Sequence, residues 1–169
     1  MAMDWSRWFR HVFASRARLA RMFPIQALNA IEQAITASEL THSGEIRFAI
    51  EAGLEPGEIW AGKTPRQRAL EVFAALGVWD TEANNGILIY VLLADRDVEI
   101  VADRGLNDGV AQAEWNAVCN AMEERFRAEQ YEQGAVEGVH AAGRLLARQY
   151  PPLPGGRDED ELPNRPAIL

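Results

Sequence analysis

Residues 87–102 read ILIYVLLADRDVEIVA, and this stretch decides the fold. Residues 87–94 form an uninterrupted apolar run of eight residues, which is typical of a central strand buried on both faces. Residues 95–97 then read as a tight turn, and residues 98–102 alternate apolar and charged side chains as a half-buried strand does. The stretch therefore predicts a β-hairpin at the centre of the molecule.

Upstream, a second strand and a helix lead into this hairpin. Residues 45–52 alternate charged and apolar side chains and predict a half-buried strand. A loop rich in glycine and proline follows over residues 53–64, and Thr64 and Pro65 are a typical helix start. A strand, a helix and a strand in this order predict a right-handed parallel β-α-β unit.

Three further helices complete the domain, which we assign to residues 24–150. Apolar residues recur at a helical period over residues 25–40, 110–129 and 131–150. The predicted fold class is α/β: a three-layer α/β/α sandwich in which helices cover a small mixed sheet, built from the parallel β-α-β unit and the hairpin.

The two termini differ from this domain. Within residues 1–23, residues 4–23 predict one basic amphipathic helix, with an apolar stripe made of Trp5, Trp8, Phe9, Val12 and Phe13. Exposed apolar surface of this size needs a cover. We expect the stripe to dock on protein, either its own domain or a second copy, with the arginines meeting carboxylates at the rim. Peripheral contact with an anionic membrane is the alternative.

Residues 151–169 contain five prolines and an acidic run, which predict a disordered tail.

The net charge of the chain limits the classes of ligand that the domain can bind. The formal net charge is −8, of which residues 24–150 carry −10. Such a domain repels phosphate backbones, which excludes nucleic acid as the main ligand, whereas acidic loops suit hard divalent cations. Apolar runs are too short to span a membrane, and arginines interrupt the first residues, unlike a secretory signal. We therefore expect a cytoplasmic protein, with peripheral contact at the inner membrane face left open.

The predicted topology gathers polar residues at one edge of the sheet. Two parallel strands begin there and the hairpin returns there, so side chains that flank these strand ends should meet. Oxygen ligands from several loops are what Ca²⁺ or Mg²⁺ requires. The predicted metal ligands are Glu45, Asp80, Asn85 and Asp103, and further candidates at this edge are His42, Glu82, Asn84 and Arg104. Turn chemistry alone also explains a polar edge, so this alternative stays open.

The opposite edge of the sheet holds the fallback metal site, which consists of Asp95 and Asp97 in the hairpin turn.

The sequence contains little that supports a familiar type of catalytic site. It contains neither a glycine-rich phosphate loop nor a His-x-x-x-His pair nor a Gly-x-Ser-x-Gly elbow. Ser43 follows His42 directly, and adjacent side chains point apart too readily to form a nucleophile–base pair. The single cysteine, Cys119, lies in a helical pattern and predicts a buried thiol.

Residues 73–105, FAALGVWDTEANNGILIYVLLADRDVEIVADRG, resemble the centre of the TPM domain family. The shared order is an apolar helix, a polar loop ending in Asn-Gly, an apolar strand, Asp-Arg, a short strand and a glycine-containing loop. Downstream, Phe126, Tyr131, Gly134 and Gly138 match the spacing of the family. The resemblance covers about residues 25–148.

This resemblance implies an α/β/α sandwich and, in some members, divalent-cation binding. Members also act as accessory factors in photosystem repair or receptor modulation, and a plant member has weak acid phosphatase activity. We expect a cation-binding accessory or interaction domain, with a metal-assisted phosphatase acting on phosphomonoesters as the alternative. Whether the chain is an enzyme stays open. Residues 103–106 replace the Gly-Tyr-Gly-Leu often found in the family, so a site built from that loop can differ here.

Overall fold

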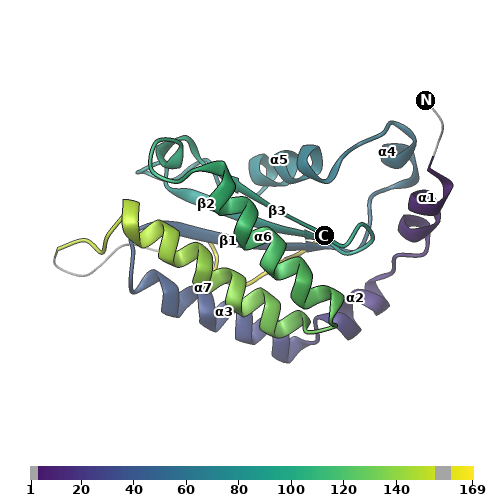
Figure 1. The fold of residues 1–169 in the computed structure, drawn as a ribbon, viewed down its shortest axis with the longest axis horizontal. Coiled ribbons are helices and arrows are strands. Elements are labelled where there is room, and N and C mark those ends of the chain that lie inside the picture. Colours follow the sequence, from purple (N-terminus) through teal and green to yellow (C-terminus); the bar gives the residue numbers. More distant parts are fainter. Residues whose placement is uncertain (1–3, 155–160) are drawn as a thin grey trace.

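The computed structural model describes residues 4–154 and 161–169. Its helices are α1 (Trp5–Val12), α2 (Arg16–Met22), α3 (Ile25–Glu39), α4 (Pro56–Trp60), α5 (Pro65–Ala75), α6 (Gln112–Arg127) and α7 (Tyr131–Gln149), with a 3-10 turn η1 (Arg104–Leu106). Its strands are β1 (Glu45–Glu51), β2 (Gly86–Leu92), β3 (Asp97–Ala102) and β4 (Ala167–Ile168) (Figure 1).

The strands form one mixed sheet in the order β3-β2-β1-β4. Strands β1 and β2 pair in parallel, and β2 and β3 pair antiparallel. This confirms the predicted β-α-β unit and hairpin. Strand β2 ends at Leu92 because the turn takes up the next four residues, with Arg96 in the left-handed region at φ 55°.

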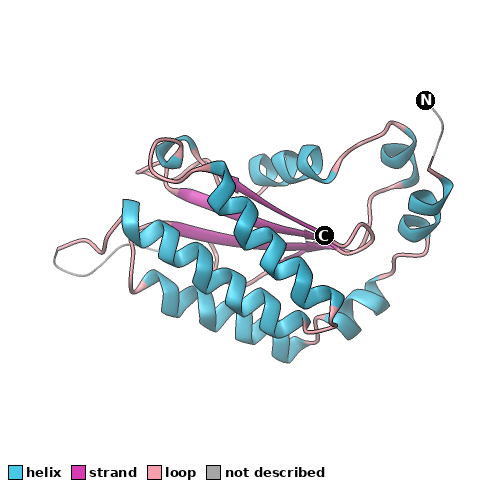
Figure 2. Cartoon of the chain, in the orientation of Figure 1, coloured by secondary structure: helices cyan, strands magenta, loops and turns pink. Residues whose placement is uncertain are grey.

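Helices cover both faces of the sheet, which confirms the predicted three-layer sandwich (Figure 2). Alternate residues of β2 face two separate cores. Ile87, Ile89 and Val91 face a core shared with α2, α3, α6 and α7. Leu88, Tyr90 and Leu92 face a second core shared with α4 and α5. The sequence pattern of β2 is continuously apolar because both faces are buried.

The N-terminal segment forms two helices where one was predicted. Helix α1 ends at Val12, and Ser15 begins α2 by accepting a hydrogen bond from Arg18 N at 3.2 Å. Ser15 has extended dihedral angles, which no helix interior allows. The break lets the chain turn, so that α2 buries Leu19 in the core while α1 lies at one end of the molecule.

The prediction of a disordered tail is wrong for residues 161–169. Leu162 is buried in the second core, and β4 extends the sheet beside β1. The guanidinium of Arg47, buried on β1, donates hydrogen bonds to the carbonyl oxygens of Pro163 and Arg165. The acidic run of the tail lies mostly in residues 155–160, which are outside the described residues.

No helix within residues 4–154 and 161–169 is both long enough and apolar enough to cross a membrane.

Candidate functional site

Three strand ends meet at the predicted edge. Glu45 on β1 and Gly86 on β2 are register partners, and Asp103 N donates to the Gly86 carbonyl at 2.9 Å. Gly86 is required here, since a Cβ atom on it would overlap the carbonyl oxygen of Val78 in the loop above. The loop from α5 to β2 therefore lies directly on the ends of the strands.

Two of the predicted ligands keep an unused oxygen. Asn85 and Asp103 are 3% and 9% exposed. Asn85 donates from its amide to the Ser43 carbonyl, and one oxygen of Asp103 accepts from Arg104 N at 2.7 Å. Asn85 Oδ1 and Asp103 Oδ2 are buried without a hydrogen-bond partner among the described residues. Such atoms are costly to bury unless water or an ion pairs with them.

The other two predicted ligands are placed differently. Glu45 is buried, and its Oε2 accepts from Leu162 N at 3.3 Å, so the C-terminal segment engages this carboxylate. Asp80 is exposed in the loop after α5. Among the described residues, no group of three or more His, Cys, Asp and Glu side chains is arranged to hold a metal ion. The predicted set of three carboxylates and one amide is therefore not assembled as a cage, because the tail uses Glu45 and solvent surrounds Asp80.

The further candidates at this edge have structural contacts. Asn84 has φ 52° and accepts from Arg104 Nε at 2.9 Å, while the backbone N–H of Glu82 donates to the Glu161 carboxylate at 2.9 Å. Tyr150 donates its hydroxyl to the carbonyl of Gly105 at 2.9 Å. These contacts hold the loops around Asn85 and Asp103 in place.

His42 is a structural residue. Its Nδ1 accepts from Gly44 N at 3.2 Å, so its Nε2 carries the proton and donates to Ser38 Oγ at 2.9 Å. Burial lowers the pKa of His42 despite the hydrogen bond from Gly44, which acts to raise it. A neutral, buried imidazole with both nitrogens occupied has no position for a substrate or metal.

At the opposite edge, Asp95 anchors the N-terminal helix. It accepts from Arg7 Nη2 at 2.8 Å and lies 2.9 Å from His11 Nε2. Burial acts to raise the pKa of Asp95, but hydrogen bonds from His11 and Arg7 lower it well below its usual range. The guanidinium groups of Arg7 and Arg10 lie beside this carboxylate, and this positive charge disfavours a metal ion at Asp95.

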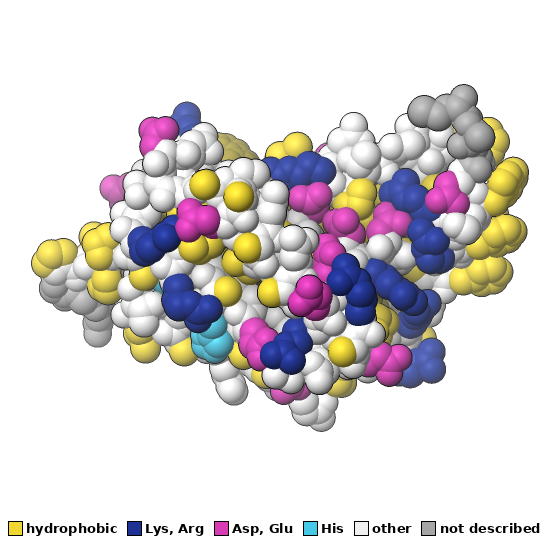
Figure 3. Space-filling model, in the orientation of Figure 1, with side chains coloured by type: hydrophobic (Ala, Val, Ile, Leu, Met, Phe, Trp, Pro, Cys, Tyr) yellow, Lys and Arg dark blue, Asp and Glu magenta, His cyan; other side chains and the backbone are white. Residues whose placement is uncertain are grey.

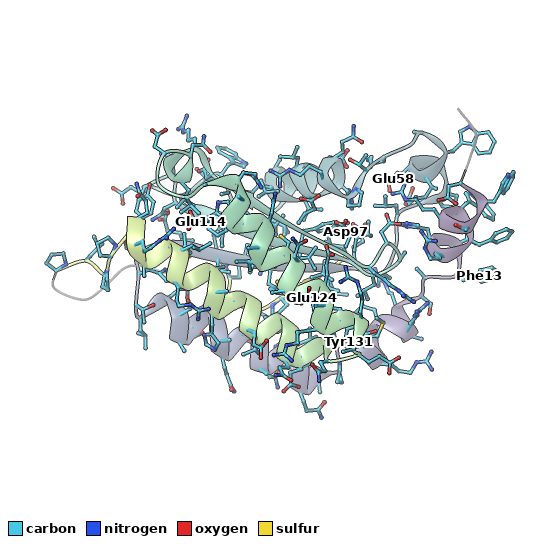
Figure 4. The ribbon with its side chains drawn as sticks, viewed as in Figure 1. Phe13, Glu58, Asp97, Glu114, Glu124 and Tyr131 are labelled. Atoms are coloured by element: carbon cyan, nitrogen blue, oxygen red, sulfur yellow. The ribbon has the colours of Figure 1, made fainter. Side chains whose placement is uncertain are left out.

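Asp97 has the opposite electrostatic environment. Burial, together with the negative charges of Glu99, Glu123 and Asp95, raises its pKa to about 6. Its Oδ1 is buried without a hydrogen-bond partner among the described residues. Figure 4 shows Asp97 beside the sheet, between α5 and α6. Glu123 is engaged elsewhere, since it accepts from Val98 N at 3.2 Å and caps the free edge of β3.

The arrangement of these elements can be compared with known proteins. A sequence model of the TPM domain matches residues 18–145. The chain belongs to the TPM domain family. Its fold is similar to the NMR structure of the BA42 protein from the psychrophilic bacterium Bizionia argentinensis, with 34% sequence identity and a TM-score of 0.72. The similarity covers 85% of this chain and 93% of BA42. A search of curated proteins found no match.

The sequence did not reveal one buried polar cluster of this TPM domain. Tyr90 donates its hydroxyl to Glu51 Oε2 at 2.5 Å, and Arg68 binds both oxygens of Glu51 at 2.9 Å. Burial raises the pKa of Tyr90, and the Glu51 carboxylate raises it further. The signal in the sequence was a glutamate at the end of β1 and a tyrosine within β2, and both also fit ordinary strand patterns.

A hollow of about 400 Å³ lies between α6 and α7 of the TPM domain. Met122, Gly134, Gly138, His140 and Arg144 are among the residues that line it. The glycines are required by packing, since a Cβ atom on Gly138 would overlap the sulfur of Met122. None of the predicted site residues lines this hollow.

Proposed function

We propose that this TPM domain is an accessory domain that binds one divalent cation, Ca²⁺ or Mg²⁺, where β1 and β2 begin and β3 ends. The observation that supports the proposal is the pair of buried oxygens without hydrogen-bond partners, Asn85 Oδ1 and Asp103 Oδ2. Their residues flank Gly86 at one end of the sheet. Buried oxygens without partners are rare in folded proteins, and a bound ion would satisfy both of these atoms.

The chemistry of the donors fits a hard cation. Asp103 would supply a carboxylate oxygen and Asn85 an amide oxygen, with backbone carbonyls and water completing the shell, as is common for Ca²⁺. With a single carboxylate ligand we expect weak binding, in the millimolar part of the range for Ca²⁺ sites. The bound ion would hold the ends of β2 and β3 together.

Calorimetric titration with Ca²⁺ tests the proposal. Asp103→Asn keeps the size of the side chain and removes the charge, and we expect the affinity to fall at least about tenfold. Asn85→Asp adds a second carboxylate and should tighten binding. Asp97→Asn is the matched control, since this half-buried carboxylate also has a buried oxygen without a partner but lies at the other end of β3. Equal affinities of the wild type and Asp103→Asn would contradict the site.

The phosphatase alternative would use the same edge, because Arg104, the cationic candidate for holding phosphate, follows Asp103 directly. A generic phosphomonoester assayed with and without Ca²⁺ or Mg²⁺ separates the two functions. Metal-dependent turnover that disappears in Asp103→Ala would replace the accessory function with phosphomonoester hydrolysis. Binding without turnover would support the accessory function.

A further inference from the structure

Helix α1 turns its aromatic side away from the domain. The exposed fractions of Trp5, Phe9 and Phe13 are 59%, 49% and 72%, and Val12 is 40% exposed. Figure 3 shows hydrophobic side chains gathered at the end of the molecule where α1 lies, and Figure 4 shows Phe13 pointing outward. The expectation that this stripe docks on its own domain is therefore wrong for these four residues, whereas Trp8 is half-buried and packs against the second core. A surface helix ordinarily buries its apolar side.

The polar side of α1 docks instead. Arg7 binds Asp95 and also donates to the Lys63 carbonyl at 2.8 Å. His11 is buried, and its Nδ1 accepts from Leu54 N at 2.9 Å. These contacts come from three separate segments and fix the rotation of the helix about its axis. The aromatic side cannot turn inward without breaking all of them.

The aromatic rings form one continuous strip, which we call the aromatic strip and define as Trp5, Phe9 and Phe13. Trp8 links the first two members, with ring centroids 6.2 Å from Trp5 and 5.2 Å from Phe9. Phe9 and Phe13 stack at 6.2 Å. Helix α1, which carries the strip, lies at an extremity of the molecule (Figure 1), and all three members of the strip are exposed.

Positive charge accompanies the aromatic strip. Arg10 has a side chain 47% exposed, and Arg16, Arg18 and Arg21 of α2 are exposed as well. Asp4 is the only acidic residue between positions 1 and 23. A helix with Trp and Phe on one side and arginines beside them has the composition of segments that lie in the interface of an anionic bilayer.

We propose that the aromatic strip and the arginines of α2 form a surface that binds anionic lipid membranes peripherally. The rings enter the boundary between headgroups and acyl chains, and the arginines pair with lipid phosphates and carboxylates. The polar contacts of Arg7 and His11 hold the strip in the orientation that membrane contact requires. This surface is independent of the cation site, which involves the other end of the sheet.

Sedimentation of the full chain with vesicles tests the proposal. We expect binding to phosphatidylcholine vesicles that contain phosphatidylserine, and binding at least about tenfold weaker to phosphatidylcholine alone. The triple variant Trp5→Ser/Phe9→Ser/Phe13→Ser should lose at least about tenfold in affinity. Neutralising Arg16, Arg18 and Arg21 with glutamine should cost about fivefold for each arginine.

Matched controls come from surfaces away from α1. Trp79 is 55% exposed in the loop before β2, and Trp79→Ser should leave vesicle binding unchanged. Replacing the exposed Arg144 and Arg148 of α7 with glutamine should also leave it unchanged. Should the triple aromatic variant fail to fold, the single Phe13→Ser variant replaces it, since Phe13 is the most exposed ring of the strip.

Two results would overturn the proposal. One is unchanged vesicle binding when the aromatic strip is replaced. The other is a full chain that ignores anionic vesicles and forms a dimer that the triple aromatic variant converts to a monomer. The second result would assign the strip to self-association.

Discussion

The guanidinium of Arg7 binds the carboxylate of Asp95, with Nη2 2.8 Å and Nε 3.0 Å from Oδ2, across 88 positions of sequence. His11 lies on the same carboxylate, 2.9 Å from its Oδ1. Through these contacts, helix α1 packs against the turn between β2 and β3. The contact decides which side of α1 faces the domain and which side faces outward.

Asp95→Asn should destabilise the protein. The carboxylate is only 10% exposed and meets the Arg7 guanidinium at 2.8 Å and the His11 imidazole at 2.9 Å. Removing one partner of a buried ion pair costs about 3 kcal/mol, since the remaining charge is left without compensation. Urea denaturation at neutral pH measures the loss. Glu137→Gln, which breaks an exposed pair with Arg125, is the control and should cost well under about 1 kcal/mol.

The same carboxylate gives a pH dependence. The pKa of Asp95 is lower in the folded chain than in the unfolded chain, so the unfolded chain takes up the proton first. Its contribution to stability is therefore complete above the unfolded pKa of about 3.9 and is lost as the pH falls below that value. The free energy of unfolding should fall less steeply in Asp95→Asn than in the wild type as the pH drops below about 4. Identical slopes would contradict the assigned pKa direction.

Asp97 should act in the opposite direction. Its pKa is raised to about 6 by burial and by neighbouring carboxylates. The protonated form contributes stability that is present below the unfolded pKa of about 3.9 and is lost as the pH rises through about 6. Asp97→Asn should therefore stabilise the protein by about 1 to 2 kcal/mol at pH 8 and have little effect near pH 4. Denaturation at both pH values measures this, and destabilisation at pH 8 would contradict it.

Gly143 allows α7 to approach α3. A Cβ atom at this position would overlap Ser38 Oγ, the hydroxyl that accepts from His42. Gly143→Ala should cost about 2 kcal/mol through overpacking. In a Ser38→Ala background the same substitution should cost less, since the obstructing hydroxyl is gone. A double-mutant cycle of unfolding free energies measures this coupling, and strict additivity would contradict it.

Substitution of Leu162 tests whether residues 161–169 pack against the domain in solution. Its side chain is 6% exposed in the core beside α5 and β2. Leu162→Ala should destabilise the domain by about 2 to 3 kcal/mol. Leu153, which precedes the undescribed residues and is 52% exposed, is the control and should tolerate alanine. Equal behaviour of the two variants would mean that the segment leaves the core in solution.

Local patterns were enough to predict much of the fold. The apolar run of β2, the alternation in β1 and the turn at Asp95 predicted the hairpin and the parallel pair, and the structure confirms both. These features depend on residues close in sequence and on the handedness of β-α-β units. The resemblance to the TPM domain also rested on such local order, and the match over residues 18–145 confirms it.

The predicted metal site was harder to predict than the fold, because it depended on the contacts of individual side chains. The sequence indicated that Glu45, Asn85 and Asp103 share one edge, and the register of the strands places their backbones there. No local pattern indicated that the Leu162 backbone would donate to Glu45, a contact across 117 positions. The strand topology determines which backbone segments lie close together. The hydrogen-bond partner of each side-chain oxygen depends on every segment that packs around it, including segments distant in sequence.

By itself, the sequence determined the elements, their pairing and the family, since hydrophobic periodicity and turn chemistry act over a few residues. The tertiary structure alone decided which side of α1 is buried, that residues 161–169 complete the sheet, and which oxygens keep no partner. An amphipathic pattern indicates that one side of a helix is apolar and the other polar, but it does not determine which side packs against the domain. Here the polar side is buried, because Asp95 and the Leu54 backbone supply partners for Arg7 and His11.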